Sequence, residues 1–175
     1  MILIGLGANL PSRRFGPPER TLPAVLDHID ASGIAVTARS RWYRSAPVPI
    51  SDDPWYVNGI ASVETVLPPN ALLARLLEVE MEFGRERGLP NAPRTVDLDL
   101  LDYNGQVLDT AAGPNGIALS LPHPRMVGRA FVLLPLRDVA PAWKHPVTGE
   151  SIDTLIADLG SVADVELLTS QEGAG

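Results

Sequence analysis

The chain has 175 residues, no cysteine and a formal net charge of −7 at pH 7. Without cysteine there are no disulfides, thiolate metal sites or cysteine nucleophiles, and the acidic balance argues against a nucleic-acid partner. The length predicts one domain over residues 1–170, with a disordered tail at 171–175. The chain shows neither a signal peptide nor an apolar run of membrane-spanning length, so we expect a cytoplasmic monomer that contacts no membrane.

The first half of the chain predicts strands that alternate with helices. Apolar residues recur at helical spacing in two segments, and the second of these follows Pro68–Pro69 and ends at Gly84. Shorter apolar runs between the turns predict strands. We expect helices at 19–32 and 70–83, and strands at 2–6, 34–43 and 56–66.

The second half begins with a strand at 95–103 that alternates strictly at its start. The dipeptide Asn104–Gly105 is a type I′ hairpin signal that leads into 106–108. A loop is expected at 109–119, and short helices at 127–136 and 152–159. Together these elements predict an α+β fold, a mainly antiparallel sheet with helices packed on it, related to the ferredoxin-like arrangement.

Two carboxylates, Asp97 and Asp99, stand two residues apart in the predicted strand. Alternate side chains of a strand face the same way, so both carboxylates leave one face while Leu98 covers the other. Such a pair repels unless a cation lies beside it, and oxygen ligands suit Mg²⁺. The alternative is an exposed strand face with two solvated acids, and a lone Asp-x-Asp pattern favours this alternative.

Five arginines bracket this strand along the chain: Arg85, Arg87, Arg94, Arg125 and Arg129. A guanidinium presents a fork of donors that matches phosphate oxygens. Arginines beside two carboxylates are what a polyphosphate bound with Mg²⁺ requires. Each arginine taken alone could instead be a solvated surface charge.

Several further residues have two interpretations each. Glu80 lies at the edge of an apolar helix stripe, where it could hold an arginine or a ligand group, or equally be a paired helix acid with a structural role. His123, between two prolines, could donate to a phosphate or be structural. Tyr56 and Phe131 could sandwich a flat ring whose edge Asn58 reads, or they could belong to the core.

Seven segments follow one another in an order typical of a known family. They are Leu6–Leu10, Tyr43–Pro47, Pro54–Asn58, Glu80–Arg87, Pro93–Asp99, Leu121–Arg125 and Ala130–Leu136. In this order they resemble the 6-hydroxymethyl-7,8-dihydropterin pyrophosphokinase family over nearly the whole chain. The segment Pro93–Asp99, followed by Leu121–Arg125, is the most specific part of the resemblance.

The resemblance implies a ferredoxin-like core and the transfer of pyrophosphate from ATP to the pterin hydroxymethyl group, which releases AMP. By the same resemblance Asp97 and Asp99 hold two Mg²⁺ ions, and Arg85 and Arg94 join them as catalytic residues. The residues expected on the ATP side are Glu80, Arg85, Arg87, Arg94, Ser120, His123 and Arg129. Those expected around the pterin are Ser45, Ala46, Val48, Tyr56, Asn58 and Phe131.

The chain departs from the family pattern in one segment, and two alternative functions are considered. Residues 88–92 lack the Arg-Trp-Gly stretch that many family members carry, which puts closure of that loop in doubt. A phosphohydrolase could use the same Asp pair to activate water and would need no pterin pocket. A non-catalytic ligand sensor would have no use for the pair.

Overall fold

The structure, a computed structural model, describes residues 1–85, 93–112 and 116–169. Within these residues the main sheet has six strands, every neighbouring pair antiparallel, in the order β5-β1-β4-β3-β8. One edge of β4 has two partners. Residues 56–58 pair with β3, and residues 61–64 pair with β2. The strands are β1 (Ile2–Ala8), β2 (Ala35–Arg39), β3 (Tyr43–Ser45), β4 (Tyr56–Glu64), β5 (Asp97–Tyr103) and β8 (Val165–Leu167).

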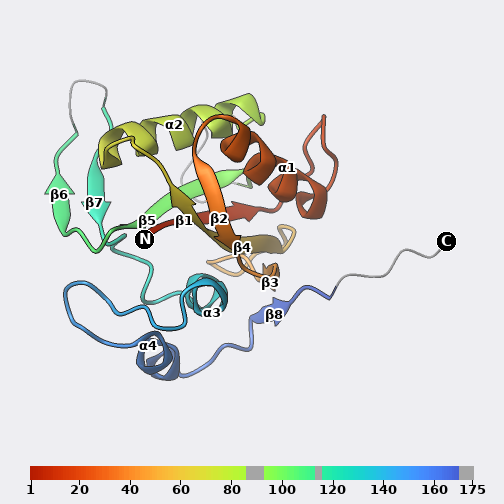
Figure 1. The fold of residues 1–175 in the computed structure, drawn as a ribbon. Helices are drawn as coiled ribbons and strands as arrows, with labels where there is room; N and C mark the ends of the chain where they lie inside the picture. The colour runs from red at the N-terminus through yellow and green to blue at the C-terminus, as the bar shows by residue number, and fades with distance from the viewer. Residues whose placement is uncertain (86–92, 113–115, 170–175) are drawn as a thin grey trace.

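Helices cover both faces of this sheet (Figure 1). On one face lie α1 (Pro18–Ala31) and α2 (Pro69–Glu82), and on the other α3 (Ala130–Val139) and α4 (Ile152–Asp158). The succession β1-α1-β2-β4-α2-β5 with spatial order β5-β1-β4-β2 is a ferredoxin-like core. The predicted α+β class is therefore confirmed, with a second helical layer added to the core.

The two helices of the first layer begin and end by the same local devices. Each starts at the second residue of a proline pair, at Pro18 and Pro69, where a missing N–H costs nothing. Each is followed by a glycine in the left-handed region, Gly33 with φ 90° and Gly84 with φ 88°. These signals are local, which is why both helices lie where the sequence predicts them.

Each helical layer packs on its own core. Alternation along β1 sends Ile2, Ile4 and Leu6 into the core under α1 and α2, while Leu3 enters the core under α3 and α4. Gly5 and Gly7 fall on the Leu3 face, where they carry no side chain. The sheet therefore leaves open space on the α3 side near the end of β1.

The predicted single strand 34–43 is wrong, because two strands occupy it. Between β2 and β3, the Ser40 N–H donates to the Ile60 carbonyl at 2.8 Å and the Ser40 Oγ accepts from the Ile60 N–H at 2.9 Å. The side chain of Ser40 thus replaces one backbone partner and the ladder is interrupted. Trp42 then covers Gly59 on the α1 side, where an added Cβ would lie 2.5 Å from the indole ring.

The predicted hairpin after β5 is correct in its turn and wrong in its pairing. Asn104 and Gly105 both adopt positive φ, and the Gln106 N–H donates to the Tyr103 carbonyl at 3.0 Å. The chain then leaves the main sheet and forms a two-stranded sheet from β6 (Leu108–Thr110) and β7 (Leu119–Leu121). The predicted 109–119 loop is therefore wrong at both ends, where β6 takes residues 109–110 and β7 begins at Leu119, because these two short strands pair with each other.

Two further differences concern the end of the chain. The helix expected at 127–136 begins at Ala130, with Arg129 in extended conformation as its N-cap. The strand β8 was not predicted at all, and it pairs with the outer edge of β3. In the described ranges no helix is long and apolar enough to cross a membrane.

Candidate active site

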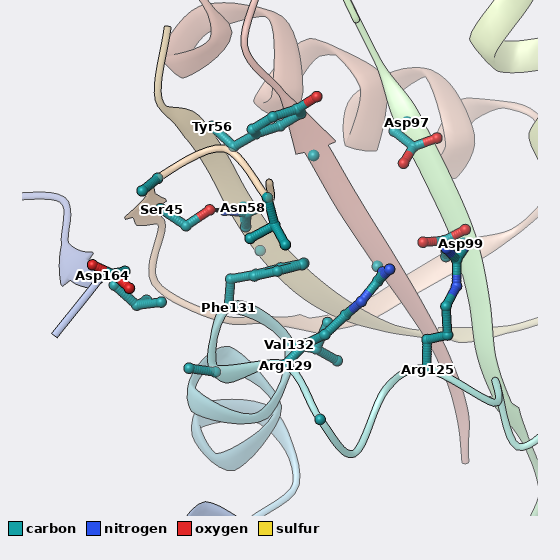
Figure 2. Close-up of a pocket in the computed structure, with 18 of the residues that line it drawn as sticks. Ser45, Tyr56, Asn58, Asp97, Asp99, Arg125, Arg129, Phe131, Val132 and Asp164 are labelled. Atoms are coloured by element: carbon teal, nitrogen blue, oxygen red, sulfur yellow. Dashed lines mark hydrogen bonds between the residues drawn. The ribbon is translucent and has the colours of Figure 1, made fainter. Parts of the chain in front are cut away.

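A pocket of about 510 Å³ opens on the α3 face of the sheet, beyond the first turn of that helix. Its floor comes from three adjacent strands, with Gly5 and Gly7 from β1, Asn58 from β4, and Asp97 and Asp99 from β5. Figure 2 shows the carboxylates at one end and the residues of β3 and β4 at the other. The glycines make the floor deep because no side chain rises from them.

Asp97 is held between two arginines. Its Oδ1 accepts from Arg94 Nη1 at 2.6 Å and from Arg85 Nη1 at 3.1 Å. Val96 and Leu98 on either side of it are buried in the first core, so alternation fixes the direction of the carboxylate. The predicted Asp pair therefore does project from one face of β5, and it is not simply solvated.

Glu80 supports Asp97 from α2. Its side chain is 2% exposed, its Oε1 accepts from the Leu98 N–H at 2.6 Å, and its Oε2 pairs with Arg85. Burial raises the pKa of Glu80 to about 7, against the opposing effects of the Leu98 N–H and Arg85. Glu80 thus holds an arginine, which is one of its two interpretations, and through Arg85 it is linked to the Asp pair.

Asp99 faces the cationic wall of the pocket. Burial and the neighbouring charge of Asp97 raise its pKa, while His123, Arg129 and Arg125 oppose the shift. In Figure 2, Arg125 and Arg129 reach from the segment before α3 toward this carboxylate. With Arg94, two carboxylates and three arginines therefore line one end of a single pocket.

His123 lies 3.9 Å from Asp99, measured from Nε2 to Oδ1. Its Nδ1 accepts a hydrogen bond from the Arg125 N–H at 3.2 Å. Burial lowers the pKa of this imidazole, so the neutral form prevails near pH 7. Because Nδ1 is an acceptor, the proton of neutral His123 sits on Nε2, which can donate toward the carboxylate end of the pocket.

The opposite end of the pocket is built from β3, β4 and the first turn of α3. Asn58 is buried, and its Nδ2 donates to Ser45 Oγ at 2.8 Å, which orients the amide. Tyr56 and Phe131 lie on either side of Ser45 and Asn58 in Figure 2. The guanidinium of Arg129 lies 5.4 Å from the Phe131 ring centre, so a cation–π contact connects the two ends.

Asn9 ties together two segments that border the pocket. Its Oδ1 accepts from the Arg94 N–H at 2.8 Å, and its Nδ2 donates to the Pro54 carbonyl at 3.1 Å. The backbone N–H of Asn9 also donates to the Arg94 carbonyl at 3.0 Å. A buried asparagine directly after β1 thus places Arg94 and the chain that leads into Tyr56.

Most of the predicted site residues meet in this pocket. Its lining includes Ser45, Ala46, Val48, Tyr56, Asn58, Arg94, Asp97, Asp99, Arg129 and Phe131. Glu80, Arg85 and His123 are not part of the lining but contact or approach the carboxylates in it. Ser120 lies in β7 opposite Asp109, away from the lining, and Arg87 lies outside the described residues.

The sequence interpretation missed one wall altogether. Ser161, Val162, Asp164 and Val165 line the pocket beside Ser45 and Ala46. They are held there because the Ala46 N–H donates to the Asp164 carbonyl at 3.1 Å and β8 pairs with β3. No local signal in this segment indicates a site. The missing side chains of Gly5 and Gly7 did carry a signal, since glycine in a strand often marks a close approach.

The donor set suits a hard cation shared with a ligand rather than a cage made by the protein. In the part of the chain that the structure describes, no three His, Cys, Asp or Glu side chains group as a metal site would require. Asp97 and Asp99 alone offer carboxylate oxygens on one strand face. Mg²⁺ is commonly held by one or two carboxylates together with phosphate oxygens and water, so these residues fit it.

The fold and the site together define a class, an α+β protein whose pocket sets paired carboxylates among arginines at one end and an amide between aromatic rings at the other. The carboxylate end has the chemistry that a phosphorylated ligand bound with a cation requires. Residues 3–141 match the family described as 7,8-dihydro-6-hydroxymethylpterin-pyrophosphokinase, and the chain belongs to that family.

Individual relatives agree with this assignment. The chain is 37% identical to the 2-amino-4-hydroxy-6-hydroxymethyldihydropteridine pyrophosphokinase of Synechocystis sp. over 162 residues, which cover 92% of this chain and 77% of the relative. The enzyme of that name from Pseudomonas aeruginosa is 38% identical over 157 residues, which cover 89% and 90%.

Solved structures show the same fold at low sequence identity. Plasmodium falciparum HPPK-DHPS with pteroate matches 90% of this chain with a TM-score of 0.69 at 14% identity. A structure titled HPPK-DHPS in complex with substrates matches 90% of the chain with a TM-score of 0.71 at 13% identity. This chain spans 42% of each of those two chains.

Proposed function

We propose that this protein transfers pyrophosphate from ATP to 6-hydroxymethyl-7,8-dihydropterin in folate biosynthesis, giving the pterin diphosphate and AMP. One observation carries the proposal. In a chain of the pyrophosphokinase family, a single pocket brings Asp97 and Asp99 together with Arg94 and Arg129 at one end and Asn58 with its two aromatic neighbours at the other.

The end of the pocket around Asn58 suits the pterin. A pterin is flat, with hydrogen-bond donors and acceptors around its edge, and Tyr56 and Phe131 offer ring faces for stacking. The Nδ2 of Asn58 is used by Ser45, which leaves its Oδ1 to accept from a ring N–H. Ala46 and Val48 add apolar lining beside Ser45.

The end around Asp97 suits ATP with Mg²⁺. We assign Asp97 and Asp99 as the residues that hold magnesium, which supplies charge neutralisation for the phosphates when it is bound. Arg94 and Arg85 balance Asp97 without a ligand, at 2.6 and 3.1 Å, and their remaining N–H groups can bind phosphate oxygens. Arg129 and Arg125 approach from the opposite wall.

The residues of this chain contribute alignment and charge rather than a strong base. The pterin hydroxyl attacks the β-phosphorus of ATP, the bond from that phosphorus to the oxygen of the α-phosphate breaks so that AMP leaves, and the hydroxyl proton passes to solvent. The stacked ring and the held phosphates must therefore bring these atoms into line. Asp97 and Asp99 are the carboxylates at that end, and in this assignment both hold magnesium, which makes them poor bases. Neutral His123 donates from Nε2 and stabilises phosphate charge without removing a proton.

The decisive assay follows nucleotide products from purified protein with MgATP and the pterin, with and without EDTA. We expect AMP to form only when the pterin is present and to disappear with EDTA. Phosphate or ADP formed without the pterin would indicate a phosphohydrolase instead. Pterin binding with no product under any condition would indicate a non-catalytic sensor.

We also propose that a single chain suffices, since every residue assigned above belongs to one chain. Light scattering at assay concentration checks the mass, and loss of activity on dilution would contradict a monomer. A cytoplasmic location and a single domain to residue 170 stay predictions from the sequence.

A further inference from the structure

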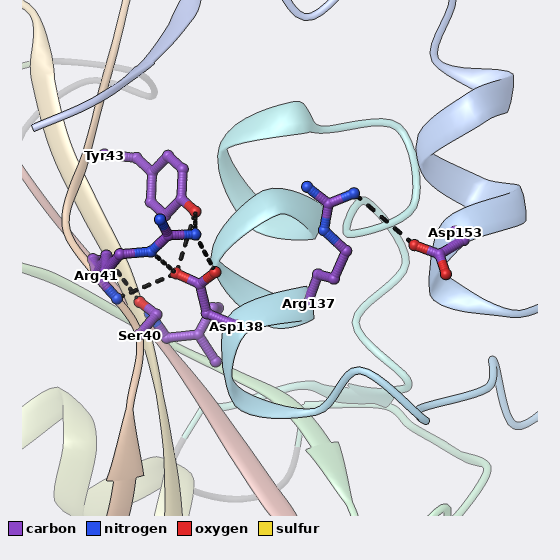
Figure 3. Close-up of polar contacts among 7 residues, drawn as sticks. Ser40, Arg41, Tyr43, Arg137, Asp138 and Asp153 are labelled. Carbon is purple, nitrogen blue, oxygen red and sulfur yellow. Dashed lines mark hydrogen bonds and ion pairs between the residues drawn. The ribbon is translucent and has the colours of Figure 1, made fainter.

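A second polar cluster lies outside the pocket, between the sheet edge and α3 (Figure 3). Two nitrogens of Arg41 donate hydrogen bonds to the Asp138 carboxylate, Nε to Oδ2 at 3.0 Å and Nη2 to Oδ1 at 2.6 Å. The hydroxyl of Tyr43 donates to Asp138 Oδ2 at 3.0 Å, and the Arg41 backbone N–H donates to the same oxygen at 3.2 Å. Nothing in the pocket uses these three residues, which we call the α3 clasp.

The clasp joins two parts of the chain that are far apart in sequence. Tyr43 is the first residue of β3, and Arg41 lies in the link before it, next to Ser40, which is bonded to Ile60 of β4. Asp138 lies in the last turn of α3. The side chain of Asp138 is 16% exposed and Tyr43 is 6% exposed, while Arg41 is 61% exposed, so the arginine reaches a largely buried carboxylate from the surface.

Both joined elements lead directly into the pterin end of the pocket. Two residues after Tyr43, Ser45 lines the pocket and orients Asn58. Seven residues before Asp138, Phe131 lines the pocket from the first turn of the same helix. A helix rises 1.5 Å per residue, so Asp138 and Phe131 are about 10 Å apart along α3, with Pro135 between them.

Apolar packing does not fix this geometry by itself. Leu133 and Leu136 bury α3 against Leu3 and Ile60, but such contacts are non-directional and allow the helix to slide or roll. The two parallel hydrogen bonds from Arg41 fix the orientation of the Asp138 carboxylate, and the hydrogen bond from the Tyr43 hydroxyl ties the same carboxylate to β3. The clasp therefore sets where α3 lies relative to β3.

We propose that Arg41, Tyr43 and Asp138 are positioning residues for pterin binding: they hold Phe131 of α3 at a set spacing from Ser45 and Asn58, and so determine affinity for the flat substrate. This inference rests on the proposed function of the pocket. The three residues touch no substrate themselves, and they act through the two walls that do. ATP is held at the carboxylate end chiefly by Asp97 and Asp99 with Arg85 and Arg94, none of which belongs to α3, so its binding should depend on the clasp less than pterin binding does.

The test compares Asp138→Asn and Tyr43→Phe with the matched control Asp153→Asn. Asp153 of α4 pairs at 3.8 Å with Arg137, the neighbour of Asp138 in α3, so the control removes a carboxylate that contacts the same helix without touching β3. We expect the pterin KM to rise about tenfold in Asp138→Asn and about threefold in Tyr43→Phe, with kcat and the ATP KM within about twofold. The control should leave all three constants unchanged.

Two further measurements separate positioning from simple support of the fold. Because both variants act through one cluster, the double variant should raise the pterin KM no more than Asp138→Asn alone. Without any substrate, the amide NMR signals of Ser45 and Phe131 should shift in Asp138→Asn and stay in place in Asp153→Asn. If Asp138→Asn does not fold, Tyr43→Phe, which loses one hydroxyl, carries the test.

An unchanged pterin KM in both variants overturns the proposal, even if their melting temperatures fall. An equal rise in the control overturns it as well, since the effect would then be general. Failure of the proposed function looks different, because the wild-type protein would then form no AMP with the pterin. In that case the NMR comparison still decides whether the clasp sets the spacing of the two walls.

Discussion

The two faces of the main sheet differ sharply although the same strands form both. Toward α1 and α2, β1 and β5 present Ile4, Leu6, Leu98 and other apolar residues in an unbroken core. Toward α3 the alternate positions of the same strands present glycines and carboxylates around a pocket. Because successive side chains of a strand point to opposite faces, each strand can stabilise the fold on one side and carry chemistry on the other.

The comparison shows that, along one strand, residues that stabilise the fold alternate with residues that line the pocket. The face toward α3 is itself divided, because Leu3, Ile60 and Leu101 pack under α3 and α4 while the neighbouring positions toward the pocket stay open. Substitutions on the packed face should change the free energy of unfolding. Substitutions on the open part should change catalysis and leave folding largely intact.

The largest effect is expected on the open face at Asp97. Asp97→Ala removes a proposed magnesium ligand and leaves Arg94 and Arg85 without their shared carboxylate. We expect kcat/KM to fall about a thousandfold or more, a loss of roughly 4 kcal/mol in transition-state stabilisation. Steady-state AMP release measures it, with Asp109→Ala on the exposed strand β6 as the matched control. A melting temperature that collapsed in parallel would show that the two faces are not separable here.

The reverse effect is expected at Leu76, a fully buried residue of α2 in the packed core. Leu76→Ala should lower the free energy of unfolding by about 2–5 kcal/mol because it leaves a cavity. Urea denaturation measures this change. Activity per folded molecule, assayed well below the transition, should remain at the wild-type value. A loss of activity in fully folded protein would contradict the comparison.

A pH-dependent effect is expected at Glu80, the buried carboxylate that links α2 to the pocket through Arg85. Its folded pKa of about 7 lies above its ordinary value of 4.5, chiefly because of burial. The folded protein therefore binds this proton more tightly than the unfolded chain does. The resulting stabilisation is complete below about pH 4.5 and is lost as the pH rises through 7, by about 3 kcal/mol at most.

Glu80→Gln does not titrate, so it isolates this contribution. The difference in unfolding free energy between the wild type and Glu80→Gln should decline from pH 5 to pH 8. Urea titrations at each pH measure it. A difference that stayed constant across this range would mean that Arg85 and the Leu98 N–H outweigh burial.

The smallest effects are expected from a pair of glycines on opposite faces. At Gly59 an added Cβ would lie 2.5 Å from the Trp42 ring on the packed side, so Gly59→Ala should cost about 1–3 kcal/mol of stability. At Gly7 an added Cβ would lie 3.3 Å from Asn58 Oδ1 on the pocket floor. Gly7→Ala should raise the pterin KM roughly fivefold, about 1 kcal/mol, with little change in stability. Effects exchanged between the two variants would refute the assignment of faces.

Local patterns account for what could be predicted. Proline pairs and following glycines mark both helices of the first layer, and alternation alone places Asp97 and Asp99 on one face. Tyr56, Asn58 and Phe131 were expected to meet because they stand in segments that resemble one family. They do line one pocket, together with Ser45 and Ala46.

The misses have a common cause. The interruption at Ser40 and the addition of β8 to the edge of β3 depend on partners far along the chain, and β6 pairs with β7 rather than with β5, the strand that precedes it. Side-chain pairs such as Arg41 with Asp138, 97 residues apart, are equally invisible to a local pattern. Nothing near Asp164 indicates that it borders a pocket.

The sequence by itself determined the helices of the first layer, the face from which each carboxylate projects, and the family, because periodicity and motif spacing are properties of short segments. The tertiary structure alone decided which strands are neighbours, which wall closes the pocket and what holds α3 in place. The physical reason is that pairing and packing are selected by burial and hydrogen-bond satisfaction over the whole chain. No short stretch of residues contains that information.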